Sequence, residues 1–449
     1  MFRFAEEDLK SWWKSSRRKP LILRGARQVG KSTLVRQFAA SMGLELFELN
    51  LEKRPLRQAF ETLDPKAVLR DVEALLGKRF DPARSLLFLD EIQANSKAIE
   101  ALRYFYEEAP KIPVIAAGSL LEFAIEDGQF SMPVGRVEYL HLGPMRFGEF
   151  LKATQAEHLY ERLSECRKKK LSIQEHELLL LKLHEYFFVG GMPEAVLAFS
   201  EGGSVVEARR VQHSILETYR DDFPKYAKKS EIDRLDRIFE YVPRALGQKV
   251  KYSNIASEVQ SKYLKAAINL LIKARVILPV FHSDCSGLPL AAGRADLVYK
   301  LYFLDVGLAN ASMGLKWEEI KQAEALWLQK GAIAEQFVAQ HLIQHAKPYP
   351  ELFYWLRDGG KGNAEIDFVF SSGGRVVPLE VKAGKSGSLK SLHQFMHEKK
   401  LKHAFRLDGA LPTKQHVDVQ LMTAKSQAHS RYQLESWPLY AVDQVVAEG

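Results

Sequence analysis

The stretch KPLILRGARQVGKSTLVRQFAASMG, residues 19–43, predicts a nucleotide-binding α/β fold. Its apolar run Leu21–Leu23 has the length of a strand, the loop GARQVGKS (25–32) follows, and an amphipathic helix comes next. This order of strand, glycine-containing loop and helix is the setting that a P-loop requires. The glycines let backbone N–H groups wrap around phosphate at the start of the helix. We therefore expect Lys31 to reach the β- and γ-phosphates of ATP and Ser32 to coordinate Mg²⁺.

A second segment, SLLFLDEIQ (85–93), supports the same site. Its continuous apolar run, Leu86–Leu89, is typical of a central parallel strand that is buried on both faces. The run ends in Asp90 and Glu91, at the strand end where α/β sheets bind their ligands. Asp90 is expected to hold Mg²⁺ through water, and Glu91 to polarise the attacking water. The alternative is that this acidic pair only opens a loop or caps the next helix.

Three further residues are candidates for sensing or stabilising the γ-phosphate. The strand PVIAAGS (113–119) ends in Ser119, which either senses that phosphate or caps the following helix. Arg136 is our candidate for the arginine that stabilises transition-state charge, acting in cis or in trans, and Arg27 is its rival. For each arginine a structural salt bridge is an equally good interpretation. The residues predicted to bind Mg-ATP are Gly25, Ala26, Arg27, Gln28, Val29, Gly30, Lys31, Ser32, Thr33, Asp90 and Ser119, and those predicted to catalyse hydrolysis are Lys31, Glu91 and Arg136.

These motifs occur with others in a familiar order along nearly the whole chain. They are RGARQVGKSTLVRQFA (24–39), LLFLDEIQ (86–93), VIAAGSLLEF (114–123), VGRVEYLHLGPMRFGEFL (134–151) and FFVGGMPEAV (187–196). Together they resemble a large prokaryotic family of AAA-type P-loop ATPases with a C-terminal restriction-endonuclease-like domain of the PD-(D/E)XK type. Ala26 stands where that family usually has proline, which changes the stiffness of the loop and leaves its chemistry intact.

The resemblance implies an α/β protein of four parts. They are a P-loop ATPase core with a parallel sheet in residues 1–155, a helical lid in 156–235, a winged helix in 236–312 and a nuclease-like α/β domain in 313–449. The segment KVKYSNIASEVQSKYLKAAINLLIKARVILPVFHS (249–283) has the expected helix-turn-helix pattern, with helices over 253–259 and 263–274 before a strand. Its Lys262, Lys265 and Asn269 either contact DNA or belong to a spacer or protein-docking module.

The segment AEIDFVFSSGGRVVPLEVKAG (364–384) predicts a hairpin with a candidate metal site. Alternation places Asp367 on one strand and Glu380 and Lys382 on the next, on the polar positions. In the PD-(D/E)XK pattern the two carboxylates bind Mg²⁺ or Mn²⁺, the lysine orients water, and an upstream acid, here Glu335, adds a further carboxylate. The alternation by itself describes an ordinary half-exposed hairpin equally well, with Asp367 and Lys382 as a cross-strand pair.

A basic stretch follows the hairpin, and its Lys385, Lys390 and Gln394 are candidates for contacts with a phosphate backbone. The whole chain carries a formal net charge of +8, which is compatible with nucleic-acid binding and equally with simple solubility.

Composition limits the remaining choices. The chain has 449 residues, 46% of them hydrophobic and 27% charged, which is typical of a multidomain globular protein. No apolar run approaches the roughly 18 residues that a membrane helix needs, and the N-terminus has no secretory pattern. Two isolated cysteines, Cys166 and Cys285, suit a reducing cytoplasm and make a disulfide unexpected.

We therefore expect a cytoplasmic ATPase that couples Mg-ATP hydrolysis to a nuclease-like module acting on or docking to DNA. The alternative is a nucleotide-switched signalling or scaffold ATPase whose winged helix and inactive nuclease fold make protein contacts. An arginine that acts in trans would require assembly of several chains, whereas one that acts in cis would not.

Overall fold

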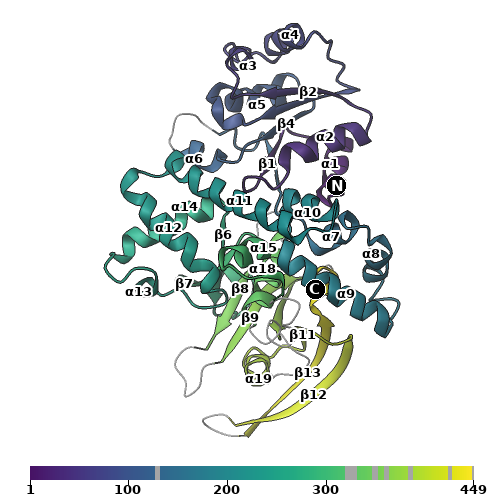
Figure 1. Cartoon of the computed structure of the whole chain (residues 1–449), viewed down its shortest axis with the longest axis vertical. Helices are drawn as coiled ribbons and strands as arrows, with labels where there is room; N and C mark the ends of the chain where they lie inside the picture. The colour runs from purple at the N-terminus through teal and green to yellow at the C-terminus, as the bar shows by residue number, and fades with distance from the viewer. Residues whose placement is uncertain are drawn as a thin grey trace. The chain divides into compact units, whose positions relative to one another are not determined.

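The computed structural model describes residues 1–126, 132–318, 331–345, 352–357, 364–382, 388–422 and 427–446. By its internal contacts the chain divides into two compact units. The first comprises Met1–Gly143 with Lys273–Arg275, and the second Pro144–Ile272 with Val276–Gly449. Figure 1 labels helices and strands of both units.

The first unit is built on a five-stranded sheet in the order β2-β3-β4-β1-β5. Every neighbouring pair in it is parallel, which confirms the predicted parallel α/β core. The strands are β1 Leu21–Arg24, β2 Glu45–Asn50, β3 Ser85–Asp90, β4 Val114–Ala117 and β5 Glu138–His141. All six residues of β3 are buried, as a central parallel strand requires.

Helices cover this sheet and supply its core with apolar side chains, among them Val68, Leu102 and Phe105. The helices are α1 Ala5–Lys14, α2 Lys31–Ser41, α3 Arg54–Gln58, α4 Pro65–Leu76, η1 Ile92–Ala94, α5 Ser96–Glu108 and α6 Leu121–Glu126. Local sequence determines α4 in particular. Asp64 caps it by accepting a hydrogen bond from the Lys66 N–H, and Gly77 ends it in the left-handed conformation.

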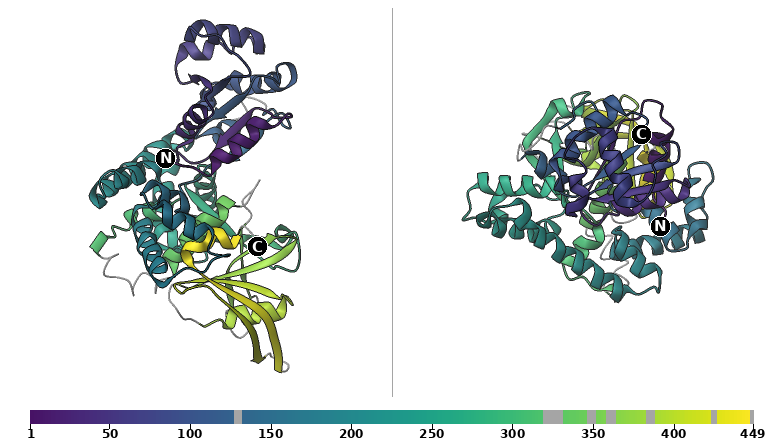
Figure 2. Two further views of the ribbon diagram at one scale, coloured as in Figure 1. Left: turned by 90° about the vertical axis from the view of Figure 1, so that its right-hand side faces the viewer. Right: turned by 90° about the horizontal axis from the view of Figure 1, so that it is seen from above.

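The second unit contains an eight-stranded mixed sheet in the order β12-β13-β11-β10-β9-β8-β6-β7. Its strands are β6 Ile277–Ser283, β7 Arg294–Phe303, β8 Phe353–Leu356, β9 Glu365–Ser372, β10 Arg375–Val381, β11 His403–Asp408, β12 Thr413–Met422 and β13 Gln427–Pro438. The last two form a long curved antiparallel pair (Figure 2). Strands β6 and β7 come from the segment predicted as a winged helix, yet they continue the same sheet through the parallel pairing of β6 with β8.

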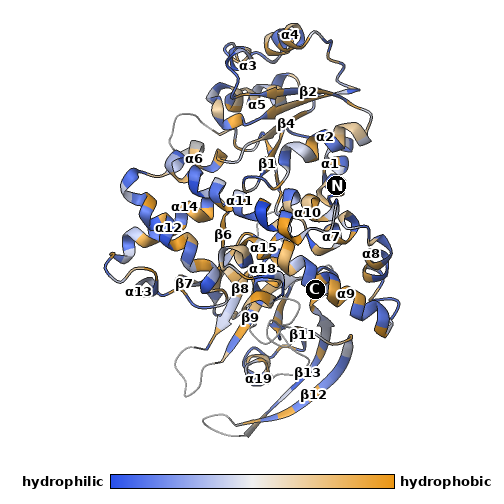
Figure 3. Ribbon diagram, in the orientation of Figure 1, coloured by the Kyte–Doolittle hydropathy of each residue, from blue (hydrophilic) through white to orange (hydrophobic). Residues whose placement is uncertain are grey.

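The described helices of this unit include the amphipathic α12, along which hydrophilic and hydrophobic residues are mixed (Figure 3). They are α7 Phe147–Ala153, α8 Glu157–Ser164, α9 Ile173–Val189, α10 Pro193–Ser200, α11 Val205–Tyr226, α12 Lys229–Arg244, α13 Tyr252–Ile255, α14 Ser261–Lys273, α15 Val306–Ser312, α18 Ala332–His345, α19 Lys390–Glu398 and α20 Val442–Val446, with the short turns η2 Leu290–Gly293 and η3 Leu439–Ala441.

One local prediction for this unit needs correction. The helix expected over 253–259 is only α13, because Ala256 takes extended backbone and ends it after one turn. Helix α7 lies in the segment predicted as the end of the ATPase core, and its Phe147 and Phe150 pack on Tyr186 of α9 in the second unit. The four-part division of the chain stays a prediction.

The predicted hairpin is present as β9 and β10, which pair antiparallel and turn through Gly373 and Gly374, both with positive φ. However, β10 lies between β9 and β11 inside the sheet, and Glu380 is only 4% exposed. The interpretation as an ordinary half-exposed hairpin is therefore wrong. Both cysteines are free and buried. No helix in the described part of the chain has the apolar length to cross a membrane.

Candidate functional site

The P-loop of the first unit depends on glycine at both ends. Gly30 has φ 89°, a left-handed conformation that glycine adopts without strain, directly before α2. At Gly25 a Cβ would lie 2.1 Å from the Leu142 carbonyl oxygen, so the loop can close there only with glycine. Lys31 is 8% exposed, and its Nζ donates to the carbonyl oxygens of Gly25, at 3.0 Å, and Ala26, at 2.8 Å. The lysine ammonium therefore lies inside the loop.

The structure brings Ser32 and Asp90 together. Ser32 Oγ lies 3.0 Å and 2.9 Å from the two carboxylate oxygens of Asp90, although the residues are 58 positions apart. Strand β4 separates β1 from β3, and the parallel arrangement places their carboxyl ends at one edge of the sheet. Burial raises the pKa of Asp90, and it lowers the pKa of Lys31 to about 8 although Glu91 and Asp90 act in the opposite direction. A cation with oxygen ligands would relieve this buried carboxylate.

Glu91 follows Asp90 in a left-handed conformation with φ 50°. Its carboxylate accepts a hydrogen bond from Gln93 Nε2 at 2.5 Å. The motif analysis did not single out Gln93. A Cβ on Gly118, at the end of β4, would lie 2.1 Å from Gln93 Oε1, so Gly118 makes room for this side chain. Gln93 therefore positions the carboxylate that was predicted to polarise water.

The other predicted loop residues take different environments. Val29 is fully buried, and its carbonyl oxygen accepts from Arg3 Nη1 at 2.8 Å, whereas Thr33 is exposed. Arg27 lies close enough to Lys31 to contribute to lowering its pKa. Ser119 follows β4, between the ends of β1 and β3, and helix α6 begins only at Leu121. The residue immediately before α6 is Leu120, so Ser119 does not occupy the N-cap position of this helix.

Arg136 lies at the opposite edge of the sheet from the P-loop. It precedes β5, whose first residue, Glu138, pairs with Leu21 at the start of β1, whereas the P-loop follows the end of β1. Arg136 Nε donates to Glu107 at 2.9 Å, and Glu107 also accepts from Arg103.

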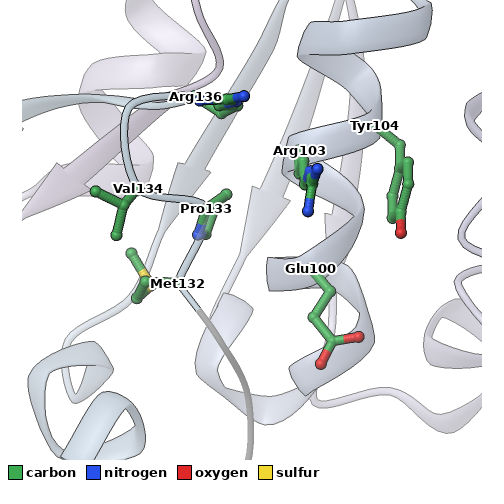
Figure 4. Close-up of a pocket in the computed structure, with 7 residues that line it drawn as sticks. All are labelled: Glu100, Arg103, Tyr104, Met132, Pro133, Val134 and Arg136. Carbon is green, nitrogen blue, oxygen red and sulfur yellow. The ribbon is translucent and has the colours of Figure 1, made fainter.

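Both arginines line a pocket of about 450 Å³, in which residues 132–136 face helix α5 (Figure 4). The residues that line it are Glu100, Arg103, Tyr104, Met132, Pro133, Val134 and Arg136.

Arg275 was not predicted as a site residue, yet its contacts assign it to the first unit. Its guanidinium lies 3.6 Å from Glu122, which Arg24 approaches at 3.5 Å. Burial, together with the charges of Arg275 and Arg24, lowers the pKa of His141 to about 4. No motif marks Arg275, because only the tertiary structure brings it to the end of β1.

The second unit brings the four predicted nuclease residues into one cluster. Asp367 Oδ2 accepts a hydrogen bond from the Val381 N–H at 2.8 Å, so this side chain holds β9 and β10 together where their regular pairing ends. Lys382 Nζ donates to Glu380 Oε1 at 2.5 Å, whereas Glu380 Oε2 is buried and has no hydrogen-bond partner among the residues that the structure describes. Burial raises the pKa of Asp367, Glu380 and Glu335 alike, and the proximity of these carboxylates raises it further at Glu335 and Glu380.

Sequence reasoning missed two members of this cluster, Lys300 and Tyr302. Lys300 of β7 is 1% exposed, and it forms ion pairs with Glu365 and, at 3.5 Å, with Glu335 Oε2. Tyr302 donates its hydroxyl to the same Glu335 oxygen at 2.9 Å. A signal for Lys300 was present, because it is the only charge in the apolar run LVYKLYFL (297–304).

The carboxylates of this cluster suit a hard cation, because Mg²⁺ is commonly held by one or two carboxylates together with water. Asp367 and Glu380 supply two such groups. Glu380 Oε2, which accepts no hydrogen bond from the described residues, is the oxygen that a bound cation would contact. Within the described ranges no group of three or more His, Cys, Asp or Glu side chains is arranged to hold a metal ion by itself.

The residues predicted to contact DNA are spread over two helices of the second unit. Lys262 and Asn269 of α14 are exposed and Lys265 is half-buried. Lys390 begins α19, and Gln394 on the same helix donates to Glu398 at 2.7 Å. Lys385 lies outside the described residues.

Family comparisons match three consecutive parts of the chain. An AAA domain matches residues 17–151, a domain of unknown function (DUF8612) matches 180–319, and a second domain of unknown function (DUF4143) matches 330–423. Residues 17–151, which match the AAA domain, contain the P-loop and the strands of the parallel sheet. No similar protein was found among curated protein sequences.

Solved structures with partial similarity include the Aeropyrum pernix ORC2 protein in ADPNP–ADP complexes, with 12% identity over 72% of this chain and 95% of the other, at a TM-score of 0.34. The Aeropyrum pernix ORC1 protein in complex with DNA has 13% identity over 70% and 93%, at 0.24. The Thermotoga maritima RuvB Holliday junction branch migration motor has 14% identity over 65% and 90%, at 0.29. TM-scores this low do not indicate a shared overall fold.

Proposed function

We propose that the first unit binds and hydrolyses Mg-ATP and that the second unit carries a metal-dependent site for phosphodiester cleavage in DNA. The ATPase assignment depends above all on the contact of Ser32 Oγ with the Asp90 carboxylate, at 3.0 Å and 2.9 Å. This contact joins a P-loop hydroxyl to an acid at the end of a buried strand. Those are the two oxygen ligands that the protein contributes to Mg²⁺ in P-loop ATPases.

Each residue of the ATP site has a separate role. Lys31 binds the β- and γ-phosphates, and the backbone N–H groups of the loop hold the phosphate chain. Ser32 and Asp90 hold Mg²⁺, which would neutralise developing charge on the phosphates. Glu91, oriented by Gln93, accepts a hydrogen bond from the attacking water and aligns it with the γ-phosphate.

Replacing Lys31 by alanine tests the ATPase. We expect phosphate release at saturating Mg-ATP to fall by about 100-fold or more, because the phosphates lose their only buried cation in the loop. Lys66→Ala is the matched control, since Lys66 is exposed on α4 of the same unit and should leave turnover unchanged. Turnover that persists in Lys31→Ala with an unchanged circular dichroism spectrum would show that the site is wrongly assigned.

The opposite-edge position of Arg136 supports a role in trans. An arginine at the edge of the sheet away from its own P-loop reaches a nucleotide only if a second chain docks head to tail. The chains therefore assemble with one another, and Arg136 of each chain completes the ATP site of its neighbour.

The nuclease assignment depends on the meeting of Asp367, Glu380 and Lys382 at one point of the mixed sheet, where Glu380 is buried and the other two side chains are half-buried. Asp367 and Glu380 would hold Mg²⁺ or Mn²⁺, and the metal would supply an activated water. Lys382 would position that water and stabilise charge on the phosphate. The exposed Lys262 and Asn269 of α14 are candidates for contacts with the DNA backbone.

Cleavage of plasmid and single-stranded DNA in Mn²⁺, with and without ATP, tests this second activity. We expect Lys382→Ala to abolish cleavage and Lys229→Ala, an exposed lysine at the start of α12, to retain it. Equal cleavage by wild type and Lys382→Ala, or none by either, would contradict the nuclease. ATP-dependent self-association without DNA binding, measured by sedimentation, would then favour the signalling or scaffold ATPase.

A further inference from the structure

Lys300 is a cation enclosed within the acidic cluster of the second unit. Its ammonium pairs with Glu365 and lies 3.5 Å from Glu335 Oε2, and the Tyr354 ring centroid is 5.2 Å from Nζ. The side chain is 1% exposed, so water does not solvate this charge. A buried ammonium is costly unless carboxylates compensate it, which means that the cluster and Lys300 depend on each other.

The cluster has two sides, each with its own lysine. On one side Lys382 contacts Glu380 Oε1, and Asp367, which accepts from the Val381 N–H between the strands, lies close enough to both lysines for each to lower its pKa. On the other side Lys300 contacts Glu335 and Glu365. Four carboxylates face two ammonium groups, which leaves two formal negative charges uncompensated, the charge of one divalent ion.

Glu335 is also held against rotation toward a metal. Tyr302 donates to Glu335 Oε2 at 2.9 Å, and the backbone of Gly247, with φ 72°, lies close to the same oxygen. A Cβ at Gly247 would lie 2.7 Å from that oxygen, so the backbone passes as close to the carboxylate as glycine allows. The carboxylate is thus already committed to Lys300 and Tyr302.

The charge of Lys300 is stable over the physiological range. Burial by itself would lower the pKa of Lys300, but the carboxylates of Glu335, Asp367 and Glu365 outweigh it and raise that pKa above its ordinary value. The lysine therefore remains a cation wherever the protein is folded at neutral pH.

We propose that Lys300 takes the place of a divalent cation in this cluster, so that its Nζ neutralises Glu335 and Glu365 and leaves only Asp367 and Glu380 for a metal ion. This inference rests on the proposed metal site of the second unit. It makes that site a single-metal site, because the position that a second ion would take in a two-metal site is filled by a covalently attached ammonium. Lys300 is accordingly a positioning residue that determines how many ions the cluster accepts.

Counting bound Mn²⁺ tests the proposal directly. The full-length chain carries Asp90→Asn in every sample and is kept free of nucleotide, so that the P-loop does not contribute an ion. Isothermal titration and electron paramagnetic resonance of free Mn²⁺ give the number of ions bound per chain. We expect Lys300→Met to bind one more Mn²⁺ than the Asp90→Asn parent, and Lys300→Arg, which keeps the charge, to match the parent. Equal numbers in Lys300→Met and the parent would overturn the proposal.

Two further measurements separate possible causes of failure. Asp367→Asn should remove the ion that the parent binds; if that ion remains, the proposed metal site is wrong whatever Lys300→Met shows. Removing Lys300 leaves buried carboxylates uncompensated, so Lys300→Met is expected to melt below the parent without metal. Mn²⁺ should then raise the melting temperature of Lys300→Met more than that of the parent, and an equal rise in both would count against the substitution of lysine for metal.

Discussion

Replacing Asp305 by asparagine tests how a buried carboxyl joins distant parts of the second unit. Asp305 is fully buried at the start of α15, where its Oδ1 accepts from the Leu308 N–H at 3.0 Å. Its Oδ2 accepts from the Gly191 N–H at 2.6 Å, which attaches the glycine pair after α9 to the end of β7. Asp305 thus has a structural role, in which one carboxyl group joins the start of α15 to the turn after α9.

The expected effect depends on pH. Burial raises the pKa of Asp305 to about 6, against 3.8 for an ordinary aspartate, although its backbone hydrogen bonds act in the opposite direction. Between these values the folded chain binds the proton more tightly than the unfolded chain. The contribution of Asp305 to stability is therefore complete below pH 3.8 and is lost as pH rises through 6. Between pH 4.5 and pH 7 the loss is about 2 kcal/mol.

Asparagine at position 305 cannot ionise. Its one side-chain oxygen can accept from only one of the two backbone N–H groups, and its NH₂ group faces the other, which then has no acceptor. We expect Asp305→Asn to be less stable than wild type by about 1–3 kcal/mol at pH 4.5. Because only the wild type loses stability through ionisation here, this difference should shrink by about 2 kcal/mol at pH 7. At pH 7 the two proteins should therefore be about equally stable, or Asp305→Asn should be the more stable one.

Urea unfolding at several pH values between 4.5 and 7 measures this difference. A chain of two units need not unfold in one transition, so the transition to follow is the one that ATP does not shift. A difference between Asp305→Asn and wild type that stays constant within about 0.5 kcal/mol over this range would show that Asp305 does not titrate there.

Two other substitutions test packing and assembly. Gly190→Ala should severely destabilise the second unit, because its Cβ would lie 2.0 Å from Asp305 Oδ1 at a positive φ, whereas Gly202→Ala, with no atom within 4 Å, should melt like wild type. Similar melting temperatures for both variants would contradict this close approach. Arg136→Ala and Lys31→Ala should each be inactive as an ATPase and partly recover turnover when mixed, since a mixed assembly contains one intact interface. No recovery on mixing, with assembly retained, would argue against action in trans.

The first unit was predictable because its signals are local. Strand, loop and helix follow one another at Leu21–Ser41, and the apolar β3 with Asp90 and Glu91 at its end needs no partner to be recognised. Parallel pairing then brings Ser32, in the first turn of the helix that follows β1, to Asp90 at the end of β3. Gln93 was missed because its role depends on the space that Gly118 leaves beside it, on another strand.

For the second unit, the sequence by itself determined that β9 and β10 form a hairpin with Asp367, Glu380 and Lys382 on its polar positions. Alternation follows from backbone geometry alone, so it appears in a solvent-facing hairpin and in a buried one alike. Only the tertiary structure decided that this polar side is buried, because α18 and β7 bring Glu335 and Lys300 to it. Burial makes Lys300 and Glu335 depend on each other across 35 positions of the chain, and sequence spacing carries no information about such a partner.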